Sequence, residues 1–279
     1  MEVHRHAALA VTPGAVGLIG CGGIAHDVLM ALRASASNGV SVVGALARPG
    51  RSAQARSRLD GVNIVESLAE LLDRKPAVIA EVAGQGAVAE HGEAVLRSGT
   101  EFLIISVGAL ADAKLLTRLQ AAANAGKTRI LLPAGAIGGL DAIAAMRVAG
   151  LTSVRYRSRK PPAAWRGSPA ERVVDLGALT QRTLLYKGSA GEAALLYPQN
   201  ANVAAAVALA GLGFDATEVE LVADPDAPGN VHEIDAEGAA GRFAIELQGK
   251  PSRSNPKTSA LAAMSVARAL LNTRASIVI

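Results

Sequence analysis

A glycine turn near the N-terminus of the 279-residue chain has the residue types and spacing of a phosphate-binding loop. Gly20, Gly22 and Ala25 follow the apolar run 15–19 with the spacing Gly-x-Gly-x-x-Ala. Gly20 permits a tight turn, Gly22 lets a diphosphate approach the backbone, and Ala25 lets the next helix pack closely on the strand. The helix dipole favours bound phosphate. The turn predicts a dinucleotide site, with an ordinary strand–turn–helix as the alternative. The expected contacts lie in one loop: Gly20, Gly22, Gly23 and Ile24.

The loop after the second expected strand, 40–46, bears on which dinucleotide is used. In NAD-specific sites an acidic residue about 20 positions beyond the glycines bonds the ribose 2′-hydroxyl. Here no Asp or Glu follows that strand before Asp60. Arg48 and Arg51, with the hydroxyl of Ser52, instead suit a 2′-phosphate. We expect NADP or NAD as cofactor, with NADP accepted well. The alternative is that these arginines are solvated loop residues.

His232 is the candidate for proton transfer. Histidine suits this work because its unperturbed pKa is about 6.5. Only His232 lies in the second half of the chain, where an extended segment would place it on one face with Ile234 and Ala236. A core histidine is the alternative. The other histidines precede residue 92: His4, His6, His26 and His91.

The first half of the chain alternates apolar strands with helices. The expected strands are 15–19, 40–46, 77–82, 102–106 and 129–132, and later helices are expected at 67–72, 87–98 and 112–125. Such strands form a Rossmann-type doubly wound parallel sheet, covered on both faces. Its ligands gather at the carboxyl ends of the strands, which places Ala83, Ser106 and Ala136 around the cofactor.

The pattern changes after Gly135. Alternating segments at 153–158, 218–222 and 242–247 predict an open, largely antiparallel sheet in a second α/β domain. Helices are expected at 136–148, 190–197, 202–212 and 259–271, the last returning to the first domain. We expect a dinucleotide-binding domain of 14–134 with 255–279, and a substrate and dimerisation domain of 135–254.

Composition excludes several classes of function. The net charge is only +4 and no basic run is interleaved with aromatic residues, so nucleic-acid binding is not indicated. The single cysteine, Cys21, precludes an intrachain disulfide, and no group of residues has metal-ligand spacing. No stretch approaches the ~20 apolar residues of a membrane helix, and the leader 1–13 has no signal-peptide run. We therefore expect a cytoplasmic enzyme without membrane contact.

Six further motifs resemble the L-aspartate dehydrogenases and occur in that family's order. They are Gly-Ala-Ile-Gly-Gly-Leu-Asp at 135–141, Arg-Lys-Pro-Pro at 159–162, Tyr-Pro-Gln-Asn-Ala-Asn-Val-Ala at 197–204, Ala-Asp-Pro at 223–225, Asn-Val-His-Glu at 230–233 and Asn-Pro-Lys-Thr-Ser at 255–259. The resemblance implies NAD(P)-dependent deamination of L-aspartate to iminosuccinate, then oxaloacetate and ammonia. It also implies a homodimer on the second domain's sheet and a role in NAD biosynthesis.

The resemblance also implies roles for individual residues. His232 matches the family's catalytic histidine, and Ala136 and Asn202 match its nicotinamide contacts. Helix packing for Ala136 and a helix N-cap for Asn202 are the alternatives.

The substrate's two carboxylates need cationic partners. Arg159, Lys160 and Lys257 are the candidates, with solvated surface positions as the alternative. Two other functions stay open: a Rossmann oxidoreductase of the homoserine dehydrogenase or dihydrodipicolinate reductase type, and a non-catalytic dinucleotide sensor.

Overall fold

The computed structural model describes residues 14–35, 39–254 and 258–278, and these form two compact units. The described part of the first unit comprises 14–35, 39–104, 119–131 and 266–278. The second unit comprises 105–118, 132–254 and 258–265. The exact boundaries of the two expected domains stay a prediction.

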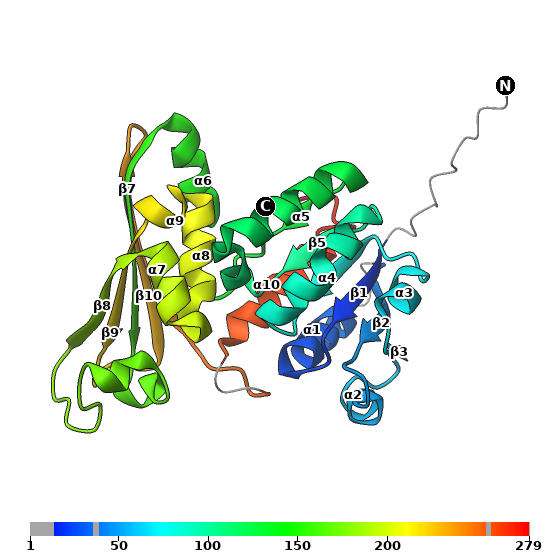
Figure 1. Ribbon diagram of the computed structural model, residues 1–279, viewed down its shortest axis with the longest axis horizontal. Coiled ribbons are helices and arrows are strands. Elements are labelled where there is room, and N and C mark those ends of the chain that lie inside the picture. Colours follow the sequence, from blue (N-terminus) through cyan, green and yellow to red (C-terminus); the bar gives the residue numbers. More distant parts are fainter. Residues whose placement is uncertain (1–13, 36–38, 255–257, 279) are drawn as a thin grey trace. The chain divides into compact units, whose positions relative to one another are not determined.

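The first unit is built on a six-stranded sheet of order β3-β2-β1-β4-β5-β6, in which all pairs are parallel (Figure 1). The strands are short and mostly buried, as expected for a sheet covered on both faces. Their bounds are β1 Ala15–Ile19, β2 Ser41–Leu46, β3 Ile64–Val65, β4 Val78–Glu81, β5 Glu101–Ile104 and β6 Ile130–Leu131. The predicted Rossmann-type sheet is confirmed.

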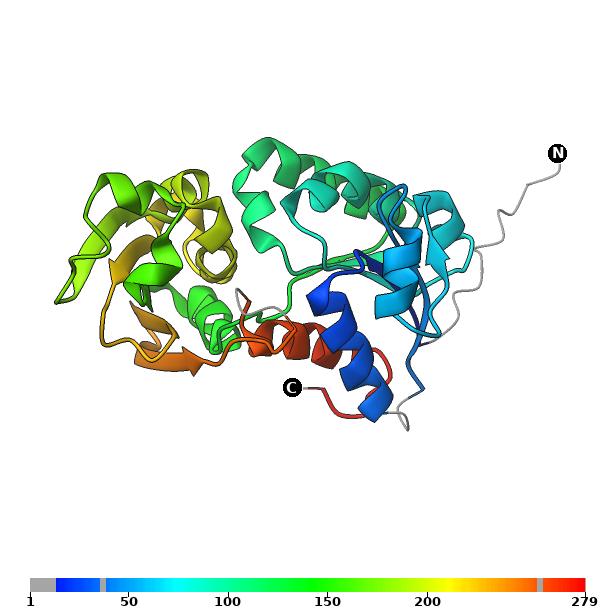
Figure 2. The same ribbon diagram turned by 90° about the horizontal axis from the view of Figure 1, so that it is seen from below.

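Helices flank this sheet on both sides. Figure 2 shows α1 and the red α10 on one face and α4 with α5 on the other. In α1, Val28, Leu29 and Leu32 are buried at helical spacing, and Ile24 is half-buried. The bounds are α1 Gly23–Ala34, α2 Ser52–Arg58, α3 Leu68–Leu72, α4 Gln85–Arg97, α5 Ala113–Gly126 and α10 Ala260–Leu271.

The strand order reverses at β1, which lies between β2 and β4. In open α/β sheets ligands bind outside the carboxyl ends of the strands at such a point. Gly20 follows β1 and Ala83 follows β4, so both residues lie at this position.

The second unit contains a five-stranded sheet of order β11-β10-β7-β9-β8. The β7–β9 pair is parallel, and the other three pairs are antiparallel. The sheet is therefore largely antiparallel, as predicted. The bounds are β7 Leu151–Lys160, β8 Thr183–Ser189, β9 Glu218–Ala223, β10 Asn230–Gly238 and β11 Gly241–Gly249.

One face of this sheet, called here the inner face, packs against helices (Figure 1). Helix α7 begins with a capping box formed by Ser189 and Glu192. Helix α8 is apolar on all sides and mostly buried, as expected of a core helix. The helices are α6 Leu140–Ala149, α7 Ala190–Leu196, α8 Ala201–Ala210 and α9 Gly213–Ala216, with 3₁₀ turns η2 Val107–Ala111, η3 Pro162–Trp165, η4 Pro169–Arg172 and η5 Pro198–Asn200.

Three local predictions need correction. Helix α6 begins at Leu140 rather than 136, because Gly139 adopts a left-handed conformation (φ +78°) that delays the helix. Strand β3 was not predicted, since it has only two residues. Asn202 is not an N-cap, because α8 starts one residue earlier with Asn200 in the capping position.

None of the described helices has the length and apolar character needed to cross a bilayer.

Candidate active site

The predicted phosphate loop of the first unit has the geometry that a bound diphosphate needs. Gly20 has a φ of +107°, and a Cβ at this position would lie 2.8 Å from the Cβ of Ala83. A side chain at Gly20 is therefore excluded by both backbone conformation and space. A Cβ at Gly22 would meet nothing within 4 Å, so the space above this residue is open.

The start of α1 is left available to an anion. Its N-cap is Gly22, which provides no side-chain cap, and its first turn carries no acidic residue. The first amides of an α-helix lack intrahelical partners. Ala25 is fully buried, which agrees with close packing of helix on strand. The residues of this loop fit a dinucleotide diphosphate.

A buried carboxylate shapes the neighbouring loop. Glu81, the last residue of β4, accepts hydrogen bonds from the backbone amides of Ala83 (2.7 Å) and Gly84 (2.6 Å). These contacts fix the turn that packs against Gly20. The predicted cofactor position Ala83 is thus held by a residue that sequence reasoning did not select.

Cys21 is a space-filling residue of the glycine turn. Burial raises the pKa of its thiol, an effect that Arg58 partly opposes. The thiol approaches the carbonyl oxygen of Leu46 at 3.6 Å. A thiol with a raised pKa is a poor nucleophile at neutral pH.

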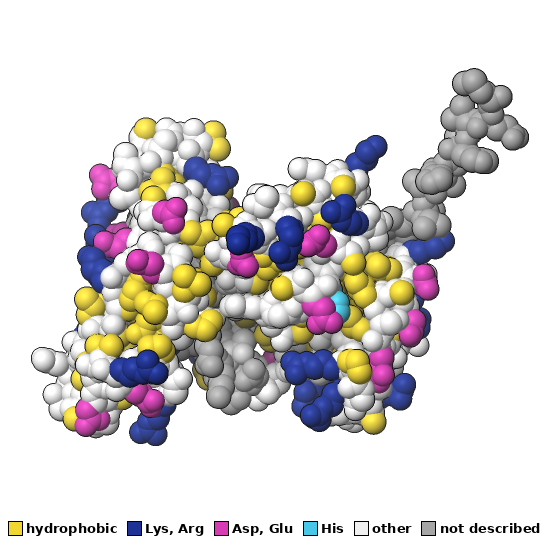
Figure 3. All heavy atoms as spheres, in the orientation of Figure 1, with side chains coloured by type: hydrophobic (Ala, Val, Ile, Leu, Met, Phe, Trp, Pro, Cys, Tyr) yellow, Lys and Arg dark blue, Asp and Glu magenta, His cyan; other side chains and the backbone are white. Residues whose placement is uncertain are grey.

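The loop beyond β2 brings positive and negative charge together. Arg48, Arg51, Arg56 and Arg58 are exposed on α2 and the loop before it, and Figure 3 shows dark blue side chains gathered around this helix. The Ser52 hydroxyl, however, donates to the carboxylate of Glu66. Glu66 directly follows β3, whose last residue pairs with the end of β2. This acidic residue was missed because β3 was missed.

The second unit gathers polar side chains on the inner face of its sheet. Tyr156, Ser158 and Lys160 alternate along β7 with residues that face the other way. His232 lies on β10 directly opposite Ser158. The Tyr156 hydroxyl is 2.7 Å from Nδ1 of His232, and both side chains are buried. His232 shares its face with Ile234 and Ala236, as predicted.

Lys160 extends this group toward the end of β7. Its ammonium donates to the side-chain oxygen of Asn200 and lies 5.2 Å from the centroid of the Trp165 ring. Trp165 is fully buried, and its Nε1 has no hydrogen-bond partner in the described part of the chain. Lys160 is therefore held by one neutral polar partner and one aromatic face.

Burial lowers the pKa of both basic groups, and the charge of Lys160 adds to the shift of His232. Burial lowers the pKa of Lys160 to about 8. Burial, and then the charge of Lys160, lower the pKa of His232 to about 4. Both shifts disfavour the protonated, positively charged forms. No nearby anion among the described residues therefore offsets the burial of His232 and Lys160.

Arg159 lies on the opposite, outer face of the sheet. Its guanidinium binds Asp224 (2.7 Å), Glu246 (3.0 Å) and Glu233. Arg155 and Arg157 occupy the same face and pair with carboxylates of the flanking strands. The structure thus brings Lys160 to His232 and leaves Arg159 in an ion-pair network.

The remaining predicted residues of the second unit within the described ranges are Asn202, Ser106 and Ala136. Asn202 is exposed, and its side-chain oxygen accepts from the amide of Gly108 at 3.0 Å. Ser106 is buried directly before η2, and Ala136 is half-buried in a turn after Gly135. Lys257 lies outside the described residues.

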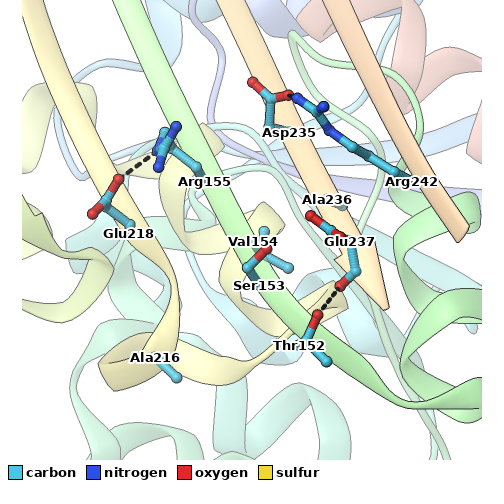
Figure 4. A pocket seen from close by; sticks show the side chains of 10 residues that line it. All are labelled: Thr152, Ser153, Val154, Arg155, Ala216, Glu218, Asp235, Ala236, Glu237 and Arg242. Carbon is cyan, nitrogen blue, oxygen red and sulfur yellow. Dashed lines mark hydrogen bonds and ion pairs between the residues drawn. The ribbon is translucent and has the colours of Figure 1, made fainter. Parts of the chain in front are cut away.

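A hollow of about 250 Å³ lies elsewhere, lined mainly by outer-face side chains. Figure 4 shows that the ion pairs Arg155–Glu218 and Arg242–Asp235 border it. None of the predicted site residues lines it. Within the described residues, no three His, Cys, Asp or Glu side chains form a group that could hold a metal ion.

Two models of known protein families match separate stretches of the chain. Residues 141–273 match the family model described as aspartate dehydrogenase, C-terminal, and residues 20–133 match homoserine dehydrogenase, NAD binding domain. An L-aspartate dehydrogenase of Ruegeria pomeroyi is 49% identical over 94% of this chain and 93% of its own length. The chain belongs to the L-aspartate dehydrogenase family. Another family member, from Pseudomonas aeruginosa, is 46% identical over 91% of this chain and 96% of its own.

A solved structure of an aspartate dehydrogenase shares the fold. The crystal structure of aspartate dehydrogenase from Thermotoga maritima matches with a TM-score of 0.74 at 26% identity, covering 95% of this chain and 98% of that one. The predicted family and the NAD(P)-binding Rossmann-type domain are confirmed. The roles of individual residues stay predictions.

Proposed function

We propose that this protein catalyses the reversible NAD(P)-dependent oxidative deamination of L-aspartate. The observation that carries the proposal is the pair His232 and Lys160 on one sheet face, where His232 is buried and Lys160 is half-buried. Burial lowers the pKa of both groups, and neither pairs with a carboxylate among the described residues. A dicarboxylate substrate supplies negative charge. Membership of the L-aspartate dehydrogenase family supports the same substrate.

Several residues are proposed as contacts for the cofactor. Gly22, Gly23 and Ile24 would bind the diphosphate through backbone amides. Gly20, whose own amide donates to the Leu46 carbonyl, and Ala83 would lie beside them. Arg48 would contact the adenosine ribose or its 2′-phosphate. Ala136 and Asn202 are the proposed nicotinamide contacts, and Ser106 is a further proposed contact for the cofactor. Bound NAD(P)⁺ supplies the acceptor for the hydride that leaves the substrate's α carbon.

Lys160 is the proposed partner of a substrate carboxylate, and Lys257 is a second candidate. An anion next to Lys160 raises the pKa of both Lys160 and His232 toward their ordinary values. Arg159 is already bound by three carboxylates, so it supports the sheet rather than the substrate.

His232 is the proposed acid–base. After hydride transfer the substrate is iminosuccinate, to which water adds. Neutral His232, the form present at neutral pH, takes a proton from the attacking water and returns it to the nitrogen of the carbinolamine. His232, neutral again, takes the hydroxyl proton of the carbinolamine as the C–N bond breaks, which releases ammonia and leaves oxaloacetate.

We further propose that the protein is a homodimer joined by the outer face of the second unit's sheet. In the described part of the chain no helix packs on this face, and open sheet faces are often covered by a symmetry mate. The arginines of β7 are already neutralised by carboxylates, which lowers the cost of covering them. The cytoplasmic location and the role in NAD biosynthesis stay predictions.

Cofactor reduction with a panel of L-amino acids tests the activity. The expected result is turnover with L-aspartate and little with homoserine or L-alanine. Turnover of another substrate of the panel in preference to aspartate would favour a different Rossmann oxidoreductase. Cofactor binding without any turnover would favour a dinucleotide sensor.

A further inference from the structure

The Tyr156–His232 contact joins two buried side chains on neighbouring strands. Tyr156 is fully buried and His232 is 4% exposed. Their rings lie 6.0 Å apart at an interplanar angle of 19°. Since His232 pairs across the strands with Ser158, Tyr156 is its diagonal neighbour on the inner face. The ring of His232 is therefore held by a neutral hydroxyl rather than by a carboxylate.

The Tyr156 hydroxyl stays neutral and keeps its proton. Burial raises the pKa of Tyr156, and the nearby Ser158 hydroxyl only partly opposes this rise. Beyond the contact with His232, the described part of the chain offers this hydroxyl no regular hydrogen bond. The oxygen of Ser158 is likewise buried without a hydrogen bond of regular geometry. Ser158 thus has acceptor capacity beside Tyr156.

The hydrogen bond between Tyr156 and His232 can run in either of two directions, which place the imidazole proton on different nitrogens. If Tyr156 donates to Nδ1, the neutral imidazole carries its proton on Nε2 and that nitrogen cannot act as a base. If Nδ1–H donates to Tyr156, the Nε2 lone pair is available, and Tyr156 can turn its own proton toward Ser158. Only the second arrangement gives a base at neutral pH. It also gives the buried Ser158 oxygen a partner, and buried polar groups are normally hydrogen-bonded.

We propose that Tyr156 is a positioning residue that holds the proton of His232 on Nδ1, with Ser158 as the onward acceptor. The inference rests on the proposed role of His232. The bonds run from His232 Nδ1–H to the Tyr156 oxygen, and from the Tyr156 hydroxyl to Ser158. When Nε2 gains a proton, Nδ1–H keeps the same partner, so no hydrogen bond needs to reverse. A carboxylate in place of Tyr156 would raise the pKa of His232, which a hydroxyl does not.

Nitrogen NMR of ¹⁵N-histidine-labelled protein tests the arrangement without any turnover. At neutral pH the signals lost in His232→Gln should show a protonated Nδ1 and an unprotonated Nε2. In Tyr156→Phe the proton should move to Nε2. Turnover should fall at least tenfold, because loss of the free Nε2 lone pair removes part of the about 100- to 10,000-fold that general acid–base catalysis contributes. KM for cofactor should stay within twofold. Tyr186→Phe is the matched control, because it removes a hydrogen-bonded hydroxyl of the same unit away from His232.

Two results would overturn the proposal. One is a wild-type spectrum in which His232 carries its proton on Nε2. This measurement needs no variant, so it tests the proposal even if Tyr156→Phe does not fold. The other is a Tyr156→Phe protein whose His232 signals match the wild type. Failure of the proposed function is distinct, since a protein inactive on aspartate can still show Nδ1–H.

Discussion

Arg159 and Lys160 are adjacent in sequence, yet their side chains lie on opposite faces of β7. Arg159 is bound by carboxylates on the outer face. Among the described residues, the partners of Lys160 on the inner face are a neutral side-chain oxygen and an aromatic ring. Strand β7 thus places Arg159 in a neutralised ion-pair network and Lys160 on the face of His232. Substitutions at the two positions should therefore affect different properties.

Lys160→Met should raise KM for L-aspartate. Loss of a charge-assisted hydrogen bond to a carboxylate corresponds to a change of roughly 10- to 100-fold. KM for cofactor should change little. Arg159→Met should leave KM for aspartate near the wild-type value and lower stability by on the order of 2 kcal/mol, because Arg182 still neutralises Asp224. Steady-state kinetics and thermal unfolding measure both effects, and an unchanged aspartate KM in Lys160→Met would remove Lys160 from the substrate site.

Binding of succinate should weaken above pH 8. Succinate is a dicarboxylate without an amine, so its own charge is constant in this range. Lys160 is protonated below its pKa of about 8, and each pH unit above that value should weaken binding about tenfold. Tyr156, with a raised pKa, and His232, with a pKa of about 4, do not titrate between pH 7 and 10.

Lys160→Arg provides the control for this pH dependence, because a guanidinium does not deprotonate in the range tested. Its succinate affinity should stay level from pH 7 to 10. Isothermal titration calorimetry gives both curves. A level wild-type curve would contradict the proposed contact.

His232→Ala should lower turnover by about 100- to 10,000-fold, the usual contribution of general acid–base catalysis. NADPH or NADH binding, followed by fluorescence, should be nearly unaffected. His91→Ala removes a histidine of α4 in the first unit and serves as the control. Near-normal turnover of His232→Ala would end its assignment as acid–base.

Cofactor choice should depend on opposite charges at Arg48 and Glu66. Arg48→Asp should weaken NADP binding about tenfold or more while NAD binding is kept, as expected for loss of one charge-assisted hydrogen bond. Glu66→Gln should favour NADP, because it removes the acidic partner of Ser52. The ratio of kcat/KM for the two cofactors measures both changes. Strong wild-type discrimination against NADP would show that Glu66 outweighs the arginines.

The protein should sediment as a dimer at micromolar concentration. Leu184 is half-exposed on β8 and pairs with Val222, an outer-face position. Leu184→Glu should therefore give a folded monomer. Leu195→Glu, on the exposed side of α7, should leave the dimer intact. A monomeric wild type, or a dimeric Leu184→Glu protein, would argue against this interface.

Regular patterns in the sequence predicted most of the fold. Apolar runs marked β1, β4 and β5, and alternation marked β7, β9 and β11. Strand β3 has two residues and leaves no periodic signal, so Glu66 could not be placed beside Ser52. Left-handed Gly139 delayed α6, because a glycine's conformation depends on its surroundings.

The candidate site was only partly predictable for a related reason. Alternation correctly placed His232 on the face with Ile234 and Ala236. The same alternation places Arg159 and Lys160 on opposite faces of β7. It does not tell which of these faces packs against the helices, because that depends on the pairing of β7 with β10, 70 or more residues away in sequence. Tyr156 could be recognised only once that pairing was known, since its role comes from the contact with His232.

The alternation of side chains along β7 limits how this family can change. Inserting one residue before Tyr156 would turn Tyr156, Ser158 and Lys160 outward and bring the arginines to the inner face. Such an insertion would destroy the proposed reaction and the ion-pair network together. In laboratory evolution, new substrate preferences should therefore arise from point substitutions at every second position of β7, and variant libraries with single-residue insertions in this strand should yield almost no active clones.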